Sequence, residues 1–542
     1  MTDKSALQYK FRLDGYPPRA LSTSKVTKRH RVPDVIAGLD ANADNVPLAE
    51  DAGLPSPNNE TTKISIFTTG RPSTLEAVLS ELPPREDVDR YLSRYFKVKF
   101  VVLPFVHIQH FQRMPPEEGG RSSAKNRLLT AAAQCLTLGD FTQPQRYVIE
   151  ALLLYAQCKY MCSPEPVGEL WVLFGVIMRQ ALRMGYHRDP SRLQNVTVFE
   201  GEMRRRCWTI MRQLDLLNSY QMGLPSSTQS LNSDTALPRN LEDSDFDECS
   251  TVLPAARPPT EPSHLLYFIV KASLMTTFEE VLKYESSFEV PSGHKVATID
   301  AELRRVHEAI PLPLRLRSMA HSFADASDVI VMRANIEVLF QKSICILHRR
   351  NLTMQRPSVE TMDRCTEASM MMLRLQVDLH QEAQPGGQLH EERWILSSLN
   401  TSDFFLAGMI LSLVLLQLRR RTSEREFESI VQPKLELLLK SLAIFDAQKT
   451  MSRQAGKIVS ALKPMERKIR AMYALLPSSE APGNEYEPVD IPLFFTDPRL
   501  PEDDSMGGTQ STYKLDDFSV ALDDFDWTSF DQYPFDAGEL GP

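Results

Sequence analysis

The sequence predicts an all-α protein with a large helical body between two ends that are expected to be disordered. Apolar residues recur at spacings of three and four through the middle of the chain, as at Met332, Ile336 and Leu339. Runs of alternating apolar and polar residues, which would indicate strands, are scarce. Both ends lack helical periodicity and are rich in Pro, Ser and Asp, a composition that does not support a packed core.

Helical patterns begin near Ser73, and in Glu81–Phe96 two prolines and acidic residues precede an apolar stripe at Val88, Leu92 and Phe96. Further helical patterns cover Pro144–Met161, Val167–Met184, Glu200–Met222, Ser263–Tyr284, Asp328–His348, Glu360–Leu379, Trp394–Leu418 and Lys434–Phe445. We therefore predict a mostly disordered basic segment at residues 1–75, one helical domain at residues 76–475 and a disordered acidic tail at residues 476–542.

The most apolar stretch of the chain is Phe404–Leu418, which is 15 residues long. A helix needs about 20 apolar residues to span a bilayer. We therefore expect this stretch to be a buried helix and the protein to have no membrane partner.

The first 32 residues carry eight basic and two acidic side chains. Four of the basic residues fall within seven positions: Lys25, Lys28, Arg29 and Arg31. Such a cluster suits recognition by a nuclear-import receptor or contact with phosphates, and a merely solvated stretch of chain is the alternative. It is the candidate nuclear-import signal.

The tail combines acidic and aromatic residues. From Glu485 to Pro542 there are 15 acidic and two basic residues. The acidic residues alternate with the candidate activation residues, which are Phe518, Phe525, Trp527, Phe530, Tyr533 and Phe535. This composition is typical of activation segments, because charge repulsion keeps the aromatic rings solvated and available to a co-activator. The alternative is a tail that docks on its own helical body.

The chain contains a His187-Arg188-Asp189 triplet like that of the protein-kinase catalytic loop. Pro190 follows it, Gln194 stands where a metal-binding Asn is required, and no Gly-rich loop or Asp-Phe-Gly is present. Phosphate-loop, nucleophile-elbow and zinc-protease motifs are also absent. We expect no enzyme activity and no catalytic residues.

The cysteines do not predict a metal site. Cys158 and Cys162 lie four apart on one helical face, but two thiolates do not complete a tetrahedral zinc site. We expect both to be buried as small apolar residues. His380 and His390 flank a polar turn that is better explained by solvation than by metal binding.

Arg204, Arg205 and Arg206 follow one another on a predicted helix that also carries Trp208. Successive helical residues point about 100° apart, so the three arginines cannot form one compact basic face. We expect them to pair with carboxylates on neighbouring helices.

Two stretches, Glu81–Phe111 and Arg179–Pro225, resemble the fungal-specific transcription factor domain, also called the middle homology region. Leu237–Asp247, Phe340–Leu352 and Leu379–Leu413 are similar to further parts of it, and Phe525–Tyr533 resembles the close of many members. The motif residues that carry the resemblance are Gly185, His187, Arg188, Asp189, Glu202, Arg204, Arg205, Arg206, Trp208, Gly223 and Pro225.

The resemblance implies an all-helical regulatory domain in a nuclear transcription regulator, often a homo- or heterodimer. Many members control metabolic or secondary-metabolite biosynthesis gene clusters, and we expect this function here. The alternative is a helical small-molecule-sensing or inhibitory binding module that does not activate transcription directly.

Family members usually begin with six cysteines that hold two zinc ions, whereas the first cysteine here is Cys135. We therefore expect no metal or other cofactor in this chain, and zinc only if an N-terminal cluster is missing from the gene model. DNA contact through a partner protein and DNA contact of another kind are the other two explanations.

Overall fold

The computed structural model describes residues 66, 74–80, 83, 85–102, 125–162, 168–229, 231–261, 263–287, 292–354, 356–391, 401–419, 424–450 and 452–474. These residues fall in the compact unit Lys63–Pro542, and they form thirteen α-helices and three short 3-10 helices with no strand among them. The all-α prediction is therefore confirmed. The candidate import signal, the aromatic residues of the tail and nearly all of both predicted disordered ends lie outside the described residues.

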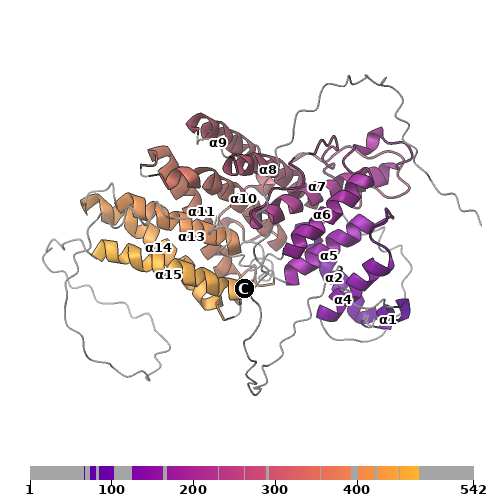
Figure 1. Cartoon of the computed structure of the whole chain (residues 1–542), viewed down its shortest axis with the longest axis horizontal. Coiled ribbons are helices and arrows are strands. Elements are labelled where there is room, and N and C mark those ends of the chain that lie inside the picture. Colours follow the sequence, from indigo (N-terminus) through magenta and orange to yellow (C-terminus); the bar gives the residue numbers. More distant parts are fainter. Residues whose placement is uncertain are drawn as a thin grey trace, which may run out of the picture. The chain divides into compact units, whose positions relative to one another are not determined.

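The first group of helices is drawn in indigo to magenta in Figure 1. It comprises α1 (Leu75–Ser80), α2 (Arg85–Val102), α4 (Lys125–Leu138), α5 (Val148–Cys162), α6 (Gly168–Arg183) and α7 (Val198–Gln221). Helix α4 packs on α5, α5 on α6, and α6 on α7. Helix α7 begins with a capping box, in which Thr197 accepts from the Glu200 amide and the Glu200 carboxylate faces the Thr197 amide.

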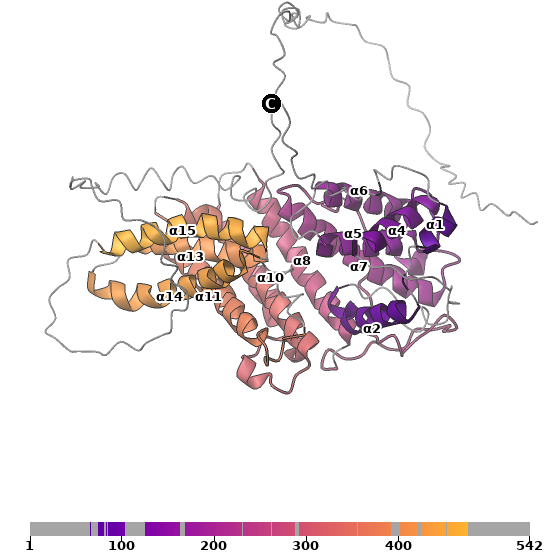
Figure 2. The ribbon, with the colours of Figure 1, turned by 90° about the horizontal axis from the view of Figure 1, so that it is seen from below.

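The centre of the fold is α10 (Ser327–Leu352), which contacts α2, α8 (His264–Glu285), α9 (Gly293–Glu308), α11 (Val359–Glu382) and α13 (Thr401–Arg419). Figure 2 shows α8 and α10 between the first group and the last helices. Helix α10 is buried on all sides, which is expected of a helix with neighbours all around it. Its buried charges are paired, for example Lys342 with Asp403 at 3.0 Å and Arg349 with Glu285 at 3.0 Å.

The last helices are α13, α14 (Glu424–Gln448) and α15 (Arg453–Ala474), which pack on one another, while α11 contacts α13 and α14. In the described part of the chain, Thr401–Leu418 is long and apolar enough to cross a membrane, but 78% of this window is buried within the protein. The prediction of a buried helix here is confirmed. One continuous apolar core extends from Ile66 to Ile469.

Candidate functional site

Two motif glycines end helices. Gly185 follows α6 and Gly223 follows α7, with positive φ angles of 77° and 63°. After α6, the Tyr186 amide donates to the Ala181 carbonyl at 2.9 Å, and α7 closes in the same way. This is the Schellman arrangement, which favours glycine because a Cβ disfavours positive φ. Pro225 lies just beyond the second glycine, where a helix cannot continue.

Asp189 anchors the turn between α6 and α7. It caps the 3-10 helix η1 (Pro190–Arg192) by accepting from the Ser191 amide at 3.0 Å and the Ser191 hydroxyl at 2.6 Å. Arg205 donates to both carboxylate oxygens, from Nε at 3.0 Å and from Nη2 at 2.7 Å, and the Ala236 amide donates at 2.9 Å. The hydrogen bonds from Arg205 hold the pKa of Asp189 well below its usual range, although burial opposes them.

The three arginines of α7 point in different directions, as the helical geometry predicts. Arg204 donates to a backbone carbonyl at the end of α6 at 3.1 Å. Arg206 is only 2% exposed and its Nη1 donates to Asp243 Oδ1 at 2.7 Å. The prediction of carboxylate partners is confirmed for Arg205 and Arg206. It is wrong about where those carboxylates lie, because both aspartates belong to loops that fold over α7 rather than to neighbouring helices.

Glu202 is fully buried beneath these arginines. Its Oε1 accepts from the Arg239 amide at 2.9 Å and lies 3.8 Å from Arg206 Nε. Burial raises the pKa of the Glu202 carboxyl, although Arg206 opposes the rise. Glu202 therefore ties the loop that follows α7 back onto the first half of the same helix.

The loop between α7 and α8 is held by further polar contacts that the sequence did not reveal. Asn240 Nδ2 donates to three backbone carbonyls, those of Arg257 at 3.0 Å, Pro258 at 3.3 Å and Glu261 at 3.2 Å. Its Oδ1 accepts from the Ser263 hydroxyl, and Ser263 in turn caps α8. A small apolar cluster beneath the loop consists of Phe199, Leu241, Phe246 and Leu253.

His264 links this loop to α10. Its Nδ1 lies 3.4 Å from Glu242 and its Nε2 lies 3.4 Å from Asp328 at the start of α10. Burial disfavours the charged imidazole, but the carboxylates of Asp328 and Glu242 outweigh it and raise the pKa of His264 to about 9. The imidazole is therefore a charged bridge between two carboxylates at neutral pH.

Two further motif residues, His187 and Arg188, contact the loop that follows α7. The His187 carbonyl accepts from the Asp234 amide and the Ser233 hydroxyl, each at 3.1 Å. Arg188 is exposed and lies 3.8 Å from the Asp234 carboxylate. Since Arg205, Ser191 and Ala236 occupy both oxygens of Asp189, its carboxylate has no free oxygen to act as a general base. The structure brings the motif residues from Gly185 to Arg206 together as a fastening between α6, α7 and the loop, whereas Gly223 and Pro225 lie at the other end of α7.

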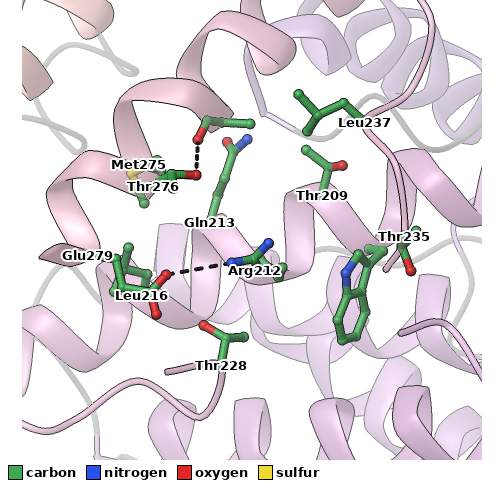
Figure 3. Close-up of a pocket in the computed structure, with 12 residues that line it drawn as sticks. Thr209, Arg212, Gln213, Leu216, Thr228, Thr235, Leu237, Met275, Thr276 and Glu279 are labelled. Carbon is green, nitrogen blue, oxygen red and sulfur yellow. Dashed lines mark hydrogen bonds and ion pairs between the residues drawn. The ribbon is translucent and has the colours of Figure 1, made fainter. Parts of the chain in front are cut away.

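A small cavity of about 50 Å³ lies between α7, the loop and α8 (Figure 3). Figure 3 shows Arg212 and Glu279 facing each other, with 3.6 Å between Nη2 and Oε2. Trp208 also lines this cavity, and its buried indole N–H has no hydrogen-bond partner. A water molecule takes up about 30 Å³ of liquid volume, so this space suits one or two waters rather than an organic ligand.

The cysteines need one correction. Cys158 is exposed, so the prediction that it would be buried is wrong. On this side α5 lines an apolar groove of about 700 Å³ that it shares with α4, and Cys158 is one of the residues that line it. The side chain of Cys162 lies outside the description. No group of three or more His, Cys, Asp or Glu side chains that could hold a metal occurs in the described ranges.

Comparison with known proteins places this arrangement in a family. Residues 92–277, which extend from α2 into α8, match the fungal specific transcription factor domain. The chain is 36% identical to the Zn(2)-C6 fungal-type transcription factor pigI of Monascus ruber, over 64% of this chain and 47% of that protein. It is 30% identical to the Zn(2)-C6 fungal-type transcription factor mpsB of Macrophomina phaseolina (strain MS6), over 86% of this chain and 72% of that protein.

A third relative is the pyrrolocin cluster transcription factor fsdR of Fungal sp. (strain NRRL 50135), which is 31% identical over 72% of this chain and 58% of that protein. The matched region thus covers from about half to three quarters of these relatives. No solved structure matches the chain. From the match over most of its length, the chain belongs to the family of Zn(2)-C6 fungal-type transcription factors and carries their fungal specific transcription factor domain.

Proposed function

We propose that this protein regulates transcription of a secondary-metabolite biosynthesis gene cluster and acts in the nucleus. The observation that carries the proposal is the similarity over most of the chain to factors named for such clusters, among them those of pyrrolocin and equisetin. Since the relatives are transcription factors, we assign the chain no enzyme activity.

The test is deletion of the gene followed by transcript profiling under conditions that induce secondary metabolism. A regulator of one cluster should lower the transcripts of a contiguous set of biosynthetic genes, and the intact gene should restore them. Unchanged transcripts in every cluster, or changes scattered over unrelated loci, would contradict the proposal.

We propose that the contact with DNA is made by a partner protein, as in a heterodimer, or by a zinc-cluster module outside these 542 residues. The first of the seven cysteines in the sequence is Cys135, and their spacing does not match the six-cysteine pattern of a zinc cluster. Sequencing the full-length transcript upstream of Met1 separates the two possibilities. Tight sequence-specific binding of DNA by the purified chain at physiological salt would contradict both.

The acidic-aromatic tail is the proposed contact with co-activators. We expect residues 485–542, fused to a foreign DNA-binding domain, to activate a reporter gene. Replacing Phe525, Trp527 and Phe530 with Ala should abolish most of that activation. The matched control replaces Phe494 and Phe495, which are aromatic residues of the same tail outside the acidic run. Equal activity of the two variants would show that the rings of the acidic run are not the contact.

Lys25, Lys28, Arg29 and Arg31 form the proposed import signal. Changing all four to Ala in a fluorescent fusion of the full chain should move it from the nucleus to the cytoplasm. The control changes Lys4, Lys10, Arg12 and Arg19, which removes the same charge from a less dense stretch. Nuclear retention of the first variant would refute this assignment.

A further inference from the structure

A second cavity lies where six helices meet. It measures about 130 Å³ and is lined by residues of α5, α6, α7, α8, α10 and α13. Four of these helices lie within or overlap the matched domain, and α10 and α13 lie beyond it. Part of the wall is apolar, with Phe174, Leu214 and Leu217 among its residues. The rest of the wall is polar, which is unusual at a junction of core helices.

The polar wall contains a buried ion pair. Lys342 Nζ lies 3.0 Å from Asp403 Oδ1, and the two side chains are 6% and 14% exposed. The rings of Tyr220 and Phe278 each lie 5.4 Å from the same Nζ. The desolvation of a buried ion pair can exceed the Coulombic gain, so the pair is weak evidence for a stabilising role and leaves room for a functional one.

The same wall carries two hydrogen-bond donors that have no acceptor among the described residues, on Asn218 and Lys271. Asn218 is only 6% exposed, and its Nδ2 has no hydrogen-bond partner. Lys271 is half-buried at the cavity, where its Nζ lies 5.6 Å from the centroid of the Tyr267 ring, and it forms no ion pair with a carboxylate of the described residues. Because Lys342 is neutralised by Asp403, Lys271 leaves the cavity with a net positive charge. An anionic acceptor would satisfy the Asn218 amide and would give the Lys271 ammonium, which has only the Tyr267 ring as a partner in the described part of the chain, a counter-charge.

We propose that this cavity binds a small organic acid of about one ring in size, with its carboxylate at Asn218 and Lys271 and its apolar part against Leu214 and Leu217. The size follows from the volume, since an apolar cavity of about 150 Å³ in another protein accommodates benzene. A ligand there would contact helices on both sides of the junction and stabilise that arrangement by mass action. This inference goes beyond the proposed function, because it concerns binding by the purified chain and needs no DNA.

The test measures binding of three acids, benzoate, cyclohexanecarboxylate and hexanoate, to the purified full chain by calorimetry and by the shift in melting temperature. Their primary amides serve as neutral counterparts. We expect at least one acid to bind more tightly than its amide. Lys271→Met and Asn218→Leu should each weaken it by about tenfold to a hundredfold, the strength of a hydrogen bond to a charged group. Lys271→Arg keeps the charge and should restore binding.

The control variant is Lys283→Met, which removes a lysine from the same helix outside the cavity and should leave binding unchanged. A cavity filled only by water predicts no saturable binding of any of the three acids at millimolar concentration, and that result would overturn the proposal. Equal affinity of acid and amide, or equal weakening by the Lys283 and Lys271 variants, would also overturn it. Circular dichroism and melting temperatures of the unliganded variants confirm that each one folds.

Discussion

Replacing Asp189 with Asn tests whether the motif is a structural fastening. The carboxylate accepts five hydrogen bonds, from Arg205, Ser191 and Ala236. In Asn, an NH2 group replaces one of the two carboxylate oxygens. In either orientation of the amide, this donor group faces at least two of the donors that bind the Asp189 carboxylate. The substitution also removes the charge opposite Arg205, whose side chain is 15% exposed.

The expected loss of unfolding free energy is large. Leaving a buried donor unsatisfied costs about 1–3 kcal/mol, and removing one partner of a buried ion pair costs about 3–5 kcal/mol. These contributions overlap, because the same arginine is counted in both. We therefore expect Asp189→Asn to lower the free energy of unfolding at neutral pH by about 3–5 kcal/mol, a large part of the stability of a typical domain.

The assay is urea unfolding followed by circular dichroism, with a double-mutant cycle. Arg205→Met in the Asp189→Asn background removes the unpaired charge. The double variant should therefore lose about 2 kcal/mol less unfolding free energy than the two single variants lose in sum. The control is Arg188→Met at the neighbouring exposed position, where a loss below about 1 kcal/mol is expected. If Asp189→Asn costs no more than this control, Asp189 is not an anchor and the reasoning fails.

Three further predictions concern a helix end, a buried imidazole and the thiols. Gly223→Ala should cost about 1 kcal/mol in urea unfolding because its φ is +63°, and Gly293→Ala at the start of α9 should cost nothing. Since the pKa of His264 is about 9 in the folded chain and 6.5 ordinarily, its contribution is full below pH 6.5 and is lost as the pH rises through 9. The side chain of His264 is 37% exposed, so we expect the free energy of unfolding to fall by only about 1 kcal/mol over this rise in pH, and not to fall in His264→Gln. If the free energy of unfolding has the same pH profile in the two proteins, the prediction is wrong. Peptide mass mapping should find iodoacetamide modification in the native chain at the exposed thiols and not at the buried ones, which are Cys207, Cys345 and Cys365.

Periodicity predicted most of the long helices, but it did not identify α4, α9 and α15. Helix α10 was expected at Asp328–His348 and extends over Ser327–Leu352. Helix α9 was not identified, because only Val296, Asp300 and Leu303 are buried along it. These three positions follow helical spacing, but the pattern is too sparse to stand out from a solvated segment.

One helix begins earlier than the sequence predicts, on the N-terminal side of a proline. Helix α14 was expected at Lys434–Phe445, yet it begins at Glu424 and continues through Pro433. The Lys434 ammonium donates to the Ile430 carbonyl at 2.6 Å in the turn before the proline. Contacts of α14 with α11, α13 and α15 compensate for the lost backbone hydrogen bond, and such tertiary support is not visible in a local pattern.

The motif residues and the cavity residues differ in how a sequence can reveal them. Apart from Gly223 and Pro225, the motif lies between Gly185 and Trp208, because a turn and the helix after it contact each other. The pattern is therefore compact and recognisable. The proposed acid site takes Asn218, Lys271, Lys342 and Asp403 from four helices, spread over more than a third of the chain. No spacing rule connects these positions, since only the packing of α7, α8, α10 and α13 brings them together. The recognisable pattern therefore identifies the scaffold, and a site for an effector must be sought among residues whose proximity appears only in the folded chain.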